Sequence, residues 1–314
     1  MHTIGIVAMK ILIAYDGSKP AIDAIESLAT AGFPETRVQA TVLSAGEAQP
    51  ELEPAFNLSP ALPIVTYALE SATETATYAR ETAEHEAEEG ADLVKTIFPN
   101  WVITSYGRTG APAVAILELA EAMKPDLIVM GSHGRSGLQR MFLGSVSLRV
   151  MRESSVSVRI TRKAPTTDSE YPPVLLLAYD ASEGANRAVH HILDRTWPRH
   201  TQLHIVSVLD VSILSSRNYL WLVGDDLQTY EKLSESRIEH AMKSLEHEMR
   251  KYFDVTTAVC IGNPVHEILA EAKRVQPDTI FIGSRGLSRL ERMLLGSVVQ
   301  GVASHVETSI EIVK

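Results

Sequence analysis

The chain carries one sequence pattern twice, and this duplication constrains the fold more than any other feature. KILIAYDGSKPAIDAI at 10–25 matches VLLLAYDASEGANRAV at 174–189. GAPAVAILELAEAMKPDLIVMGS at 110–132 likewise matches GNPVHEILAEAKRVQPDTIFIGS at 262–284. Because both matches run in the same order, the chain is predicted to form two homologous domains.

The domain boundaries follow from composition. Residues 164–173 contain three prolines and show no periodicity, which is typical of a linker. We therefore place one domain at 1–163 and the other at 174–314. Residues 1–8 precede a natural start at Met9, and we expect them to be a tail or an extension of the first strand.

Each repeat alternates β-rich runs with helical segments, which predicts an α/β fold with a parallel sheet and helices on both faces. Runs such as LIVM are apolar at every position, as expected for strands buried on both sides. Long charged helices are expected near 67–97 and 225–252. The proline-rich region 45–66 shows no clear element, and we expect a loop over or beside a site.

Composition excludes several classes of function. The 314 residues carry a formal net charge of −10, which argues against binding to nucleic acid or to anionic membranes. The single cysteine, Cys260, excludes a disulfide within the chain and fits a reducing compartment. No apolar stretch reaches the roughly 18 residues of a membrane span, and the start lacks the features of a signal peptide. We expect a cytoplasmic protein.

A glycine-rich stretch follows a buried strand in each repeat: GSHGRSGLQRMFLGS at 131–145 and GSRGLSRLERMLLGS at 283–297. Glycine lets the backbone approach a ligand, and free N–H groups at the start of the next helix favour an anion. In an open parallel sheet, ligands bind beyond the carboxyl ends of the strands. Asp16 and Asp180 end the first strand of each repeat, so we expect them in the same crevice, accepting hydrogen bonds from ribose hydroxyls. The alternative is a strand-to-helix turn that binds nothing. Neither a P-loop nor a dinucleotide fingerprint is present.

These residues resemble a known family. The spacing Gly131-x-x-Gly134, nine residues, Gly144-Ser145 is similar to the G-2x-G-9x-G-[ST] signature of ATP-binding universal stress proteins, and Gly283 to Ser297 repeats it. The resemblance covers nearly the whole chain in two copies. It implies two tandem doubly wound five-stranded domains of strand order 3-2-1-4-5, of the adenine nucleotide α-hydrolase type. It also implies that the last strands, VSVRI and SIEIV, pair within the chain as a pseudo-twofold dimer.

The resemblance also implies a set of ligand-binding residues. The aspartates would contact ribose, two residues at the ends of the second strands would hold adenine by backbone groups, and the glycine-rich stretches would hold the phosphates. The set comprises Asp16, Leu43, Gly131, His133, Gly134, Arg135, Gly144 and Ser145 in the first domain, and Asp180, Val208, Gly283, Arg285, Gly286, Gly296 and Ser297 in the second.

The second repeat departs from the family pattern at several places. Ala181 stands where the first repeat has Gly17, which we expect to be tolerated if its φ is negative. Arg285 replaces His133, and Leu287 replaces Arg135, so we expect any difference between the sites to come from these side chains. The usual proline before the last strand is absent from both repeats, which leaves the details of strand pairing open.

Three functions remain open. The first is a stress-response regulator that binds ATP, AMP or ADP at two sites, with Mg²⁺ as a candidate accompanying ion and with a protein partner of unknown identity. The second is a slow ATPase, although no dedicated base or carboxylate pair is evident. The third is a scaffolding module without nucleotide. We expect no catalytic residues and no metal site, and a further homodimer is compatible with the sequence.

Overall fold

The computed structural model describes most of the chain, with six segments left out. The described residues are 9–46, 63–134, 143–162, 171–210, 227–284 and 295–314, with the side chains of 63–73 and 227–235 also left out. The proline-rich region predicted as a loop therefore falls partly outside them. Its end at 63–66 is helical, because α2 begins at Pro63 rather than near residue 67.

The two domains repeat the same order of elements. The first contains β1 (Met9–Ala14), α1 (Lys19–Glu26), the 3₁₀ turn η1 (Ser27–Thr30), β2 (Val38–Gly46), α2 (Pro63–Ile97), β3 (Val102–Thr109), α3 (Pro112–Met123), β4 (Leu127–Gly131), α4 (Ser145–Glu153) and β5 (Ser157–Thr161). The second contains β6 (Val174–Ala178), α5 (Glu183–Leu193), β7 (Gln202–Leu209), α7 (Leu227–Met249), β8 (Asp254–Ile261), α8 (Pro264–Val275), β9 (Thr279–Gly283), α9 (Ser297–His305) and β10 (Ser309–Val313).

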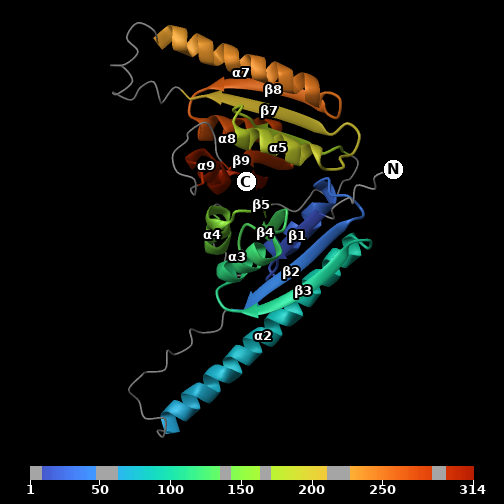
Figure 1. The fold of residues 1–314 in the computed structure, drawn as a ribbon, viewed down its shortest axis with the longest axis vertical. Helices are drawn as coiled ribbons and strands as arrows, with labels where there is room; N and C mark the ends of the chain where they lie inside the picture. Colours follow the sequence, from blue (N-terminus) through green and yellow to red (C-terminus); the bar gives the residue numbers. More distant parts are fainter. Residues whose placement is uncertain (1–8, 47–62, 135–142, 163–170, 211–226, 285–294) are drawn as a thin grey trace.

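All strands join one ten-stranded sheet in the order β3-β2-β1-β4-β5-β10-β9-β6-β7-β8. Each domain thus has the order 3-2-1-4-5, and the second domain repeats it in the opposite direction across the sheet (Figure 1). The predicted α/β fold and strand order are confirmed. Pairing is parallel throughout, except where β5 and β10 meet antiparallel, as the resemblance implied.

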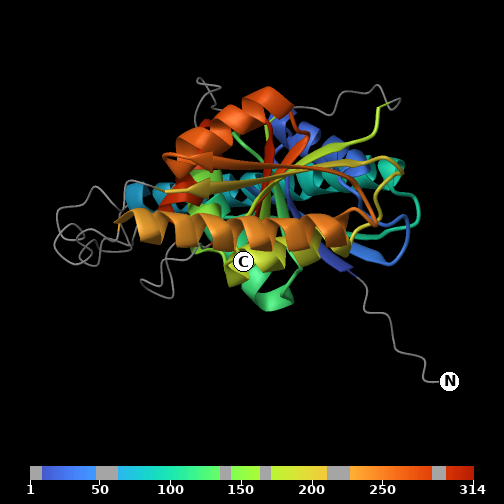
Figure 2. The same cartoon turned by 90° about the horizontal axis from the view of Figure 1, so that it is seen from above.

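Helices cover both faces of the sheet, and the buried residues show how (Figures 1 and 2). On one face, α3, α4, α8 and α9 pack on a single apolar core that runs through both domains. On the opposite face, α1 and α2 enclose one core and α5 and α7 another. Burying apolar side chains on both faces explains why β4 and β9 are apolar along their length. No helix within the described residues is long and apolar enough to cross a bilayer.

The junction of the domains, here called the seam, consists of β5, β10 and the segments 31–33 and 195–197 packed beside them. At each end of the seam, a basic side chain of one domain donates a hydrogen bond to a helix of the other domain. Arg162, just after β5, donates from Nη2 to the carbonyl of Ala303 at 2.8 Å, near the end of α9. Lys314, just after β10, donates from Nζ to the carbonyl of Met151 at 3.0 Å, near the end of α4. Cations at helix C-termini are stabilising because the last carbonyls lack helical partners.

Candidate functional site

The structure brings Asp16 and Gly134 together at the carboxyl ends of two neighbouring strands. β1 and β4 are hydrogen-bonded neighbours, and the two residues follow these strands. A Cβ built on Gly134 would lie 2.8 Å from Asp16 Oδ2, closer than any ordinary contact. The carboxylate and the start of the glycine-rich segment therefore lie side by side at the point where the strand order reverses, which is where the sequence predicted a crevice for a ligand.

The turn after each first strand has the same geometry in both domains. Asp16 Oδ1 accepts from the Ser18 N–H at 3.1 Å, and Asp180 Oδ1 accepts from the Ser182 N–H at 3.0 Å. The aspartates are thus fixed by short-range bonds before any ligand arrives.

The expectation of a negative φ at Ala181 is wrong. Ala181 has φ +60°, close to the +72° of Gly17 at the same point of the first domain. The Asp180–Ser182 hydrogen bond is made with Ala181 in the left-handed conformation, so the turn of the first domain is kept and the alanine takes a strained backbone.

Two helix N-termini lie at the ends of the fourth strands, because the Gly144 N–H donates to the Ser132 carbonyl at 2.8 Å and the Gly296 N–H donates to the Ser284 carbonyl at 3.1 Å. Gly144 is the N-cap of α4, and Gly296 is the N-cap of α9. Glycine offers no side-chain oxygen to the first-turn N–H groups, in contrast to Ser18, whose Oγ accepts from the Ala21 N–H in α1. These N-termini are therefore suited to an anion. Ser145 and Ser297 are the first helical residues and are exposed.

The first glycine of each signature has a packing role. A Cβ on Gly131 would lie 2.7 Å from the backbone of Pro20, and one on Gly283 would lie 2.4 Å from the backbone of Gly184. At both positions the start of the first helix of the domain lies directly on the end of the fourth strand. The requirement for glycine there comes from helix–strand contact, whatever else the residue does.

His133 lies between the strand end and Gly134. Its Nδ1 is 2.9 Å from Ser132 Oγ, which fixes the ring. Its Nε2 is buried and has no hydrogen-bond partner among the described residues. An unpaired buried polar atom is unfavourable, so this nitrogen would gain from a hydrogen-bond partner.

The two residues predicted at the ends of the second strands are not equivalent. Ala14 pairs with Leu43, and Ala178, its counterpart, pairs with Val206 rather than with Val208. The Tyr15 N–H donates to the Leu43 carbonyl at 2.9 Å, and the Tyr179 N–H donates in the same way to Val206. Leu43 and Val208 therefore do not occupy equivalent positions, because Val208 lies two residues further along β7 than the counterpart of Leu43. The role of each toward adenine stays a prediction.

Three predicted residues, Arg135, Arg285 and Gly286, lie outside the described residues, as does Leu287. The expected difference between the two loops therefore stays a prediction. Sequence reasoning missed one residue of the first site. Ser147 Oγ donates to the Gly131 carbonyl at 2.9 Å and so joins α4 to the end of β4. Val299 occupies the matching place in α9, and this substitution between the repeats was the available signal.

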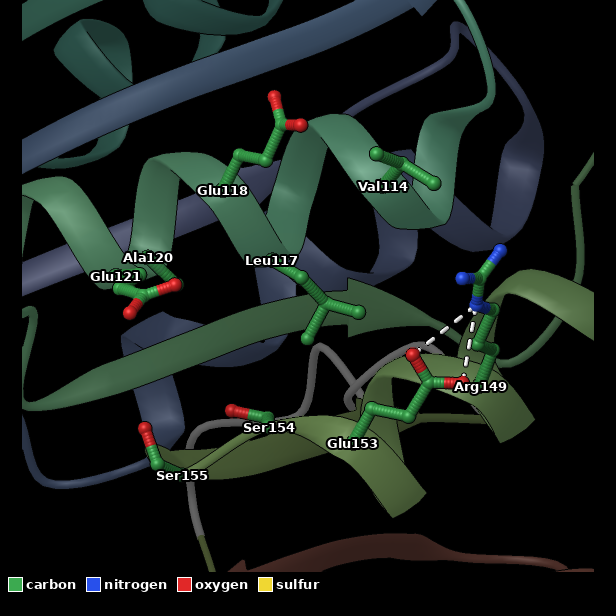
Figure 3. A pocket seen from close by; sticks show the side chains of 9 residues that line it. All are labelled: Val114, Leu117, Glu118, Ala120, Glu121, Arg149, Glu153, Ser154 and Ser155. Atoms are coloured by element: carbon green, nitrogen blue, oxygen red, sulfur yellow. Dashed lines mark hydrogen bonds and ion pairs between the residues drawn. The ribbon is translucent and has the colours of Figure 1, made fainter.

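A groove of about 460 Å³ lies elsewhere, between α3 and α4 (Figure 3). Glu118, Glu121 and Glu153 line it, and Arg149 pairs with Glu153 at 3.0 Å. Because its lining is mainly anionic, phosphate binding there is disfavoured, and none of the predicted residues contributes to it. In the described part of the chain, no three His, Cys, Asp or Glu side chains gather as a metal site would require.

Comparison with known proteins agrees with the geometry. The model of the universal stress protein family matches the chain twice, at residues 8–162 and 173–314. The chain belongs to the universal stress protein family. It carries two copies of the family's domain in tandem, as the sequence predicted.

Several universal stress proteins resemble the chain in sequence. One from Methanocaldococcus jannaschii is 38% identical over 85 residues, which is 26% of this chain and 50% of that protein. One from Mycolicibacterium smegmatis is 27% identical over 197 residues, covering 60% of this chain and 62% of the relative. The matched segments therefore span between half and two thirds of these relatives.

Solved structures share the arrangement of the whole chain. A universal stress protein from Archaeoglobus fulgidus has a TM-score of 0.62 and 23% identity, with 98% of each chain covered. A protein of unknown function from Pseudomonas aeruginosa has a TM-score of 0.56 and 14% identity, covering 98% of this chain and 92% of that one. At these identities the likeness concerns the fold.

Proposed function

We propose that this universal stress protein binds an adenine nucleotide, namely ATP, ADP or AMP, in each domain and acts as a cytoplasmic regulator of the stress response. The observation that carries the proposal is the close approach of the Asp16 carboxylate to Gly134, which leaves no room for a side chain there, together with the glycine-capped N-terminus of α4. A hydroxyl donor such as ribose suits the carboxylate, and phosphates suit the helix N-terminus.

The two ends of the crevice have opposite electrostatic character, which would orient the nucleotide. The carboxylate of Asp16 repels phosphate, while the first-turn N–H groups of α4 attract it. His133, held through Nδ1 by Ser132, offers Nε2 to the same ligand. Asp180 and the start of α9 supply the matching parts in the second domain. Binding would order the segments around each crevice and thereby change the surface offered to a protein partner.

Magnesium is not needed to explain the site. The described residues contribute one aspartate to each crevice and no cluster of carboxylates, so a Mg²⁺ ion would be held mainly by the nucleotide phosphates. The role of this chain's residues is then to bind and orient the nucleotide.

Isothermal titration of the full chain with ATP, ADP and AMP in turn tests the proposal. We expect a stoichiometry of two for at least one nucleotide. Asp16→Asn should remove the first site alone and Asp180→Asn the second alone, each bringing the stoichiometry to one. Absence of binding by all three nucleotides up to millimolar concentration would make the chain a nucleotide-free scaffold.

Hydrolysis is the competing function, and it is measured on the same samples. Release of phosphate that is linear in time and is lost in a chain with Gly144→Val and Gly296→Val would make the protein an ATPase. Release equal to that of buffer leaves binding as the function.

A further inference from the structure

The seam contains a pair of opposite charges at equivalent positions of the two repeats. Arg159 is the third residue of β5, and Glu311 is the third residue of β10. The two are direct partners in the antiparallel ladder, flanked by the pairs Ile160–Ile310 and Val158–Ile312. They therefore lie on the pseudo-twofold axis, where a symmetric pair of identical domains would place two copies of the same residue.

Both charges are buried. Arg159 is 2% exposed and Glu311 is 0% exposed, with Arg159 Nη1 3.4 Å from Glu311 Oε2. Arg159 also donates to Thr279 Oγ1 at 3.2 Å. The other carboxylate oxygen, Oε1, accepts from Arg195 Nη2 and lies 3.4 Å from His191 Nε2. Glu311 is the one carboxylate among these described groups, so removing it leaves Arg159 and Arg195 buried without a partner of opposite charge, which is strongly unfavourable.

The apolar pairs of this ladder do not favour pairing of different domains over pairing of two identical domains. Val158, Ile160, Ile310 and Ile312 are apolar and would pack equally well in any combination. The C-terminal ends of α4 and α9 each accept a hydrogen bond from a cation of the other domain, so these contacts also do not favour pairing of different domains. In the ladder between β5 and β10, the opposite charges of Arg159 and Glu311 are therefore what favours pairing of a first domain with a second domain.

The two domains also differ in the size of the side chains that they place beside the ladder. Arg195 Nη1 donates to the Ala31 carbonyl at 3.0 Å, and its guanidinium lies 4.4 Å from the centre of the Phe33 ring. A Cβ on Gly32 would lie 2.8 Å from the Trp197 ring. The first domain thus presents the small Ala31 and Gly32 to the larger Arg195 and Trp197 of the second. A pairing of two first domains would lose these contacts, and a pairing of two second domains would bring the large side chains against one another.

We propose that the seam is a self-discriminating surface: the seam face of each domain accepts the other domain and rejects a second copy of itself. In a pairing of two first domains, two Arg159 side chains would meet without water and without a carboxylate. In a pairing of two second domains, two Glu311 side chains would face one another, each bound to its own Arg195, and the size match beside the ladder would be lost. Two copies of this chain can then associate through the seam only by exchanging domains, so that every seam still joins a first domain to a second.

Two full-length variants with like charges at the seam test the proposal. Arg159→Glu places two carboxylates opposite one another, and Glu311→Arg places two guanidiniums there. Each alone should open its seam and lower its melting temperature. Mixed or produced together, the two chains should exchange domains, because one seam of the mixed dimer is then the native pair and the other is the reversed pair.

Native mass spectrometry with one chain isotopically labelled gives the readout. We expect mixed dimers to exceed each homodimer by at least about tenfold. Equal amounts of mixed and same-chain dimers, or two populations of closed monomers with native melting temperatures, would overturn the proposal. If Glu311→Arg is insoluble when made alone, recovery by production with Arg159→Glu supports discrimination, and failure to recover overturns it. Arg159→Lys with Glu311→Asp is the matched control and should remain monomeric.

Discussion

Gly17 and Ala181 occupy the same turn of the two domains with nearly the same backbone, φ +72° and φ +60°. The aspartate before each of them accepts a hydrogen bond from the N–H two residues on, and this bond closes the turn. One domain meets the left-handed requirement with glycine, and the other meets it with a residue that is strained there.

Exchanging these residues should change stability in opposite directions. We expect Ala181→Gly to stabilise the protein by roughly 0.5–1 kcal/mol and Gly17→Ala to destabilise it by about 1 kcal/mol, since strain outweighs the entropy of the unfolded glycine. Equilibrium unfolding in urea measures both changes. A loss of stability in Ala181→Gly would show that the alanine is not strained.

Gly131 and Gly134 should separate packing from binding. Gly134→Val is expected to weaken nucleotide binding in the first domain by at least about tenfold, because the side chain would fill the space beside Asp16 Oδ2. Gly131→Val should instead lower stability by about 1–3 kcal/mol through collision with the Pro20 backbone. Titration calorimetry and thermal unfolding on both variants check the contrast. The distinction between packing and binding is contradicted if Gly134→Val lowers stability as much as Gly131→Val does.

The free energy of unfolding should fall at acid pH because of two groups at the seam, His191 and Glu311. Burial lowers the pKa of His191, although Glu311 opposes this, so the unfolded chain binds the extra proton as the pH falls below about 6.5. Burial opposes ionisation of Glu311, but Arg195, His191 and Arg159 outweigh it and lower its pKa to about 2. Its contribution to stability is present above about pH 4.5 and is lost as the pH falls toward 2.

The histidine part of this dependence can be isolated. His191→Gln should flatten the slope of unfolding free energy against pH between pH 7 and pH 5. His190→Gln, at the exposed neighbouring position of α5, is the control and should keep the native slope. Burial also lowers the pKa of His204, so part of the slope should remain in both chains. Identical slopes in the two variants would assign the effect to a group outside the seam.

Gly32 should tolerate no side chain while Trp197 is present. Gly32→Ala combines a positive φ with a methyl group 2.8 Å from the indole ring, and a loss of roughly 2–4 kcal/mol is expected. In a Trp197→Leu background the collision is relieved, so the same change should cost only the backbone strain, about 1–2 kcal/mol. Equal costs in both backgrounds would contradict a direct contact. Urea unfolding of the four chains measures this cycle.

Much of this arrangement was predictable from sequence, because the repeat and the apolar strand runs impose the same order of elements on both domains. The meeting of Asp16 with the glycine-rich stretch also followed from two strand ends being neighbours. The mismatch between Leu43 and Val208 could not be read from the sequence, because the register of β2 and β7 against the first strands depends on backbone hydrogen bonds.

Other features needed three-dimensional contacts. The left-handed Ala181 follows from its turn overriding the ordinary preference of alanine. Arg159 and Glu311 could have been noticed as opposite charges in two otherwise apolar strands. Their burial and direct pairing, however, depend on α5 and on Arg195, which lie far from both strands in sequence.

The partners in the central seam pair are 152 positions apart in the chain. At the usual rate of synthesis, about 5–20 residues per second, β5 leaves the ribosome roughly 8–30 seconds before β10. During that interval β5 is an unpaired sheet edge, the kind of surface on which nascent chains of one polysome aggregate. The arginine at its centre disfavours antiparallel pairing with the same strand of a neighbouring nascent chain, because two arginines would then face one another where the folded chain has Glu311.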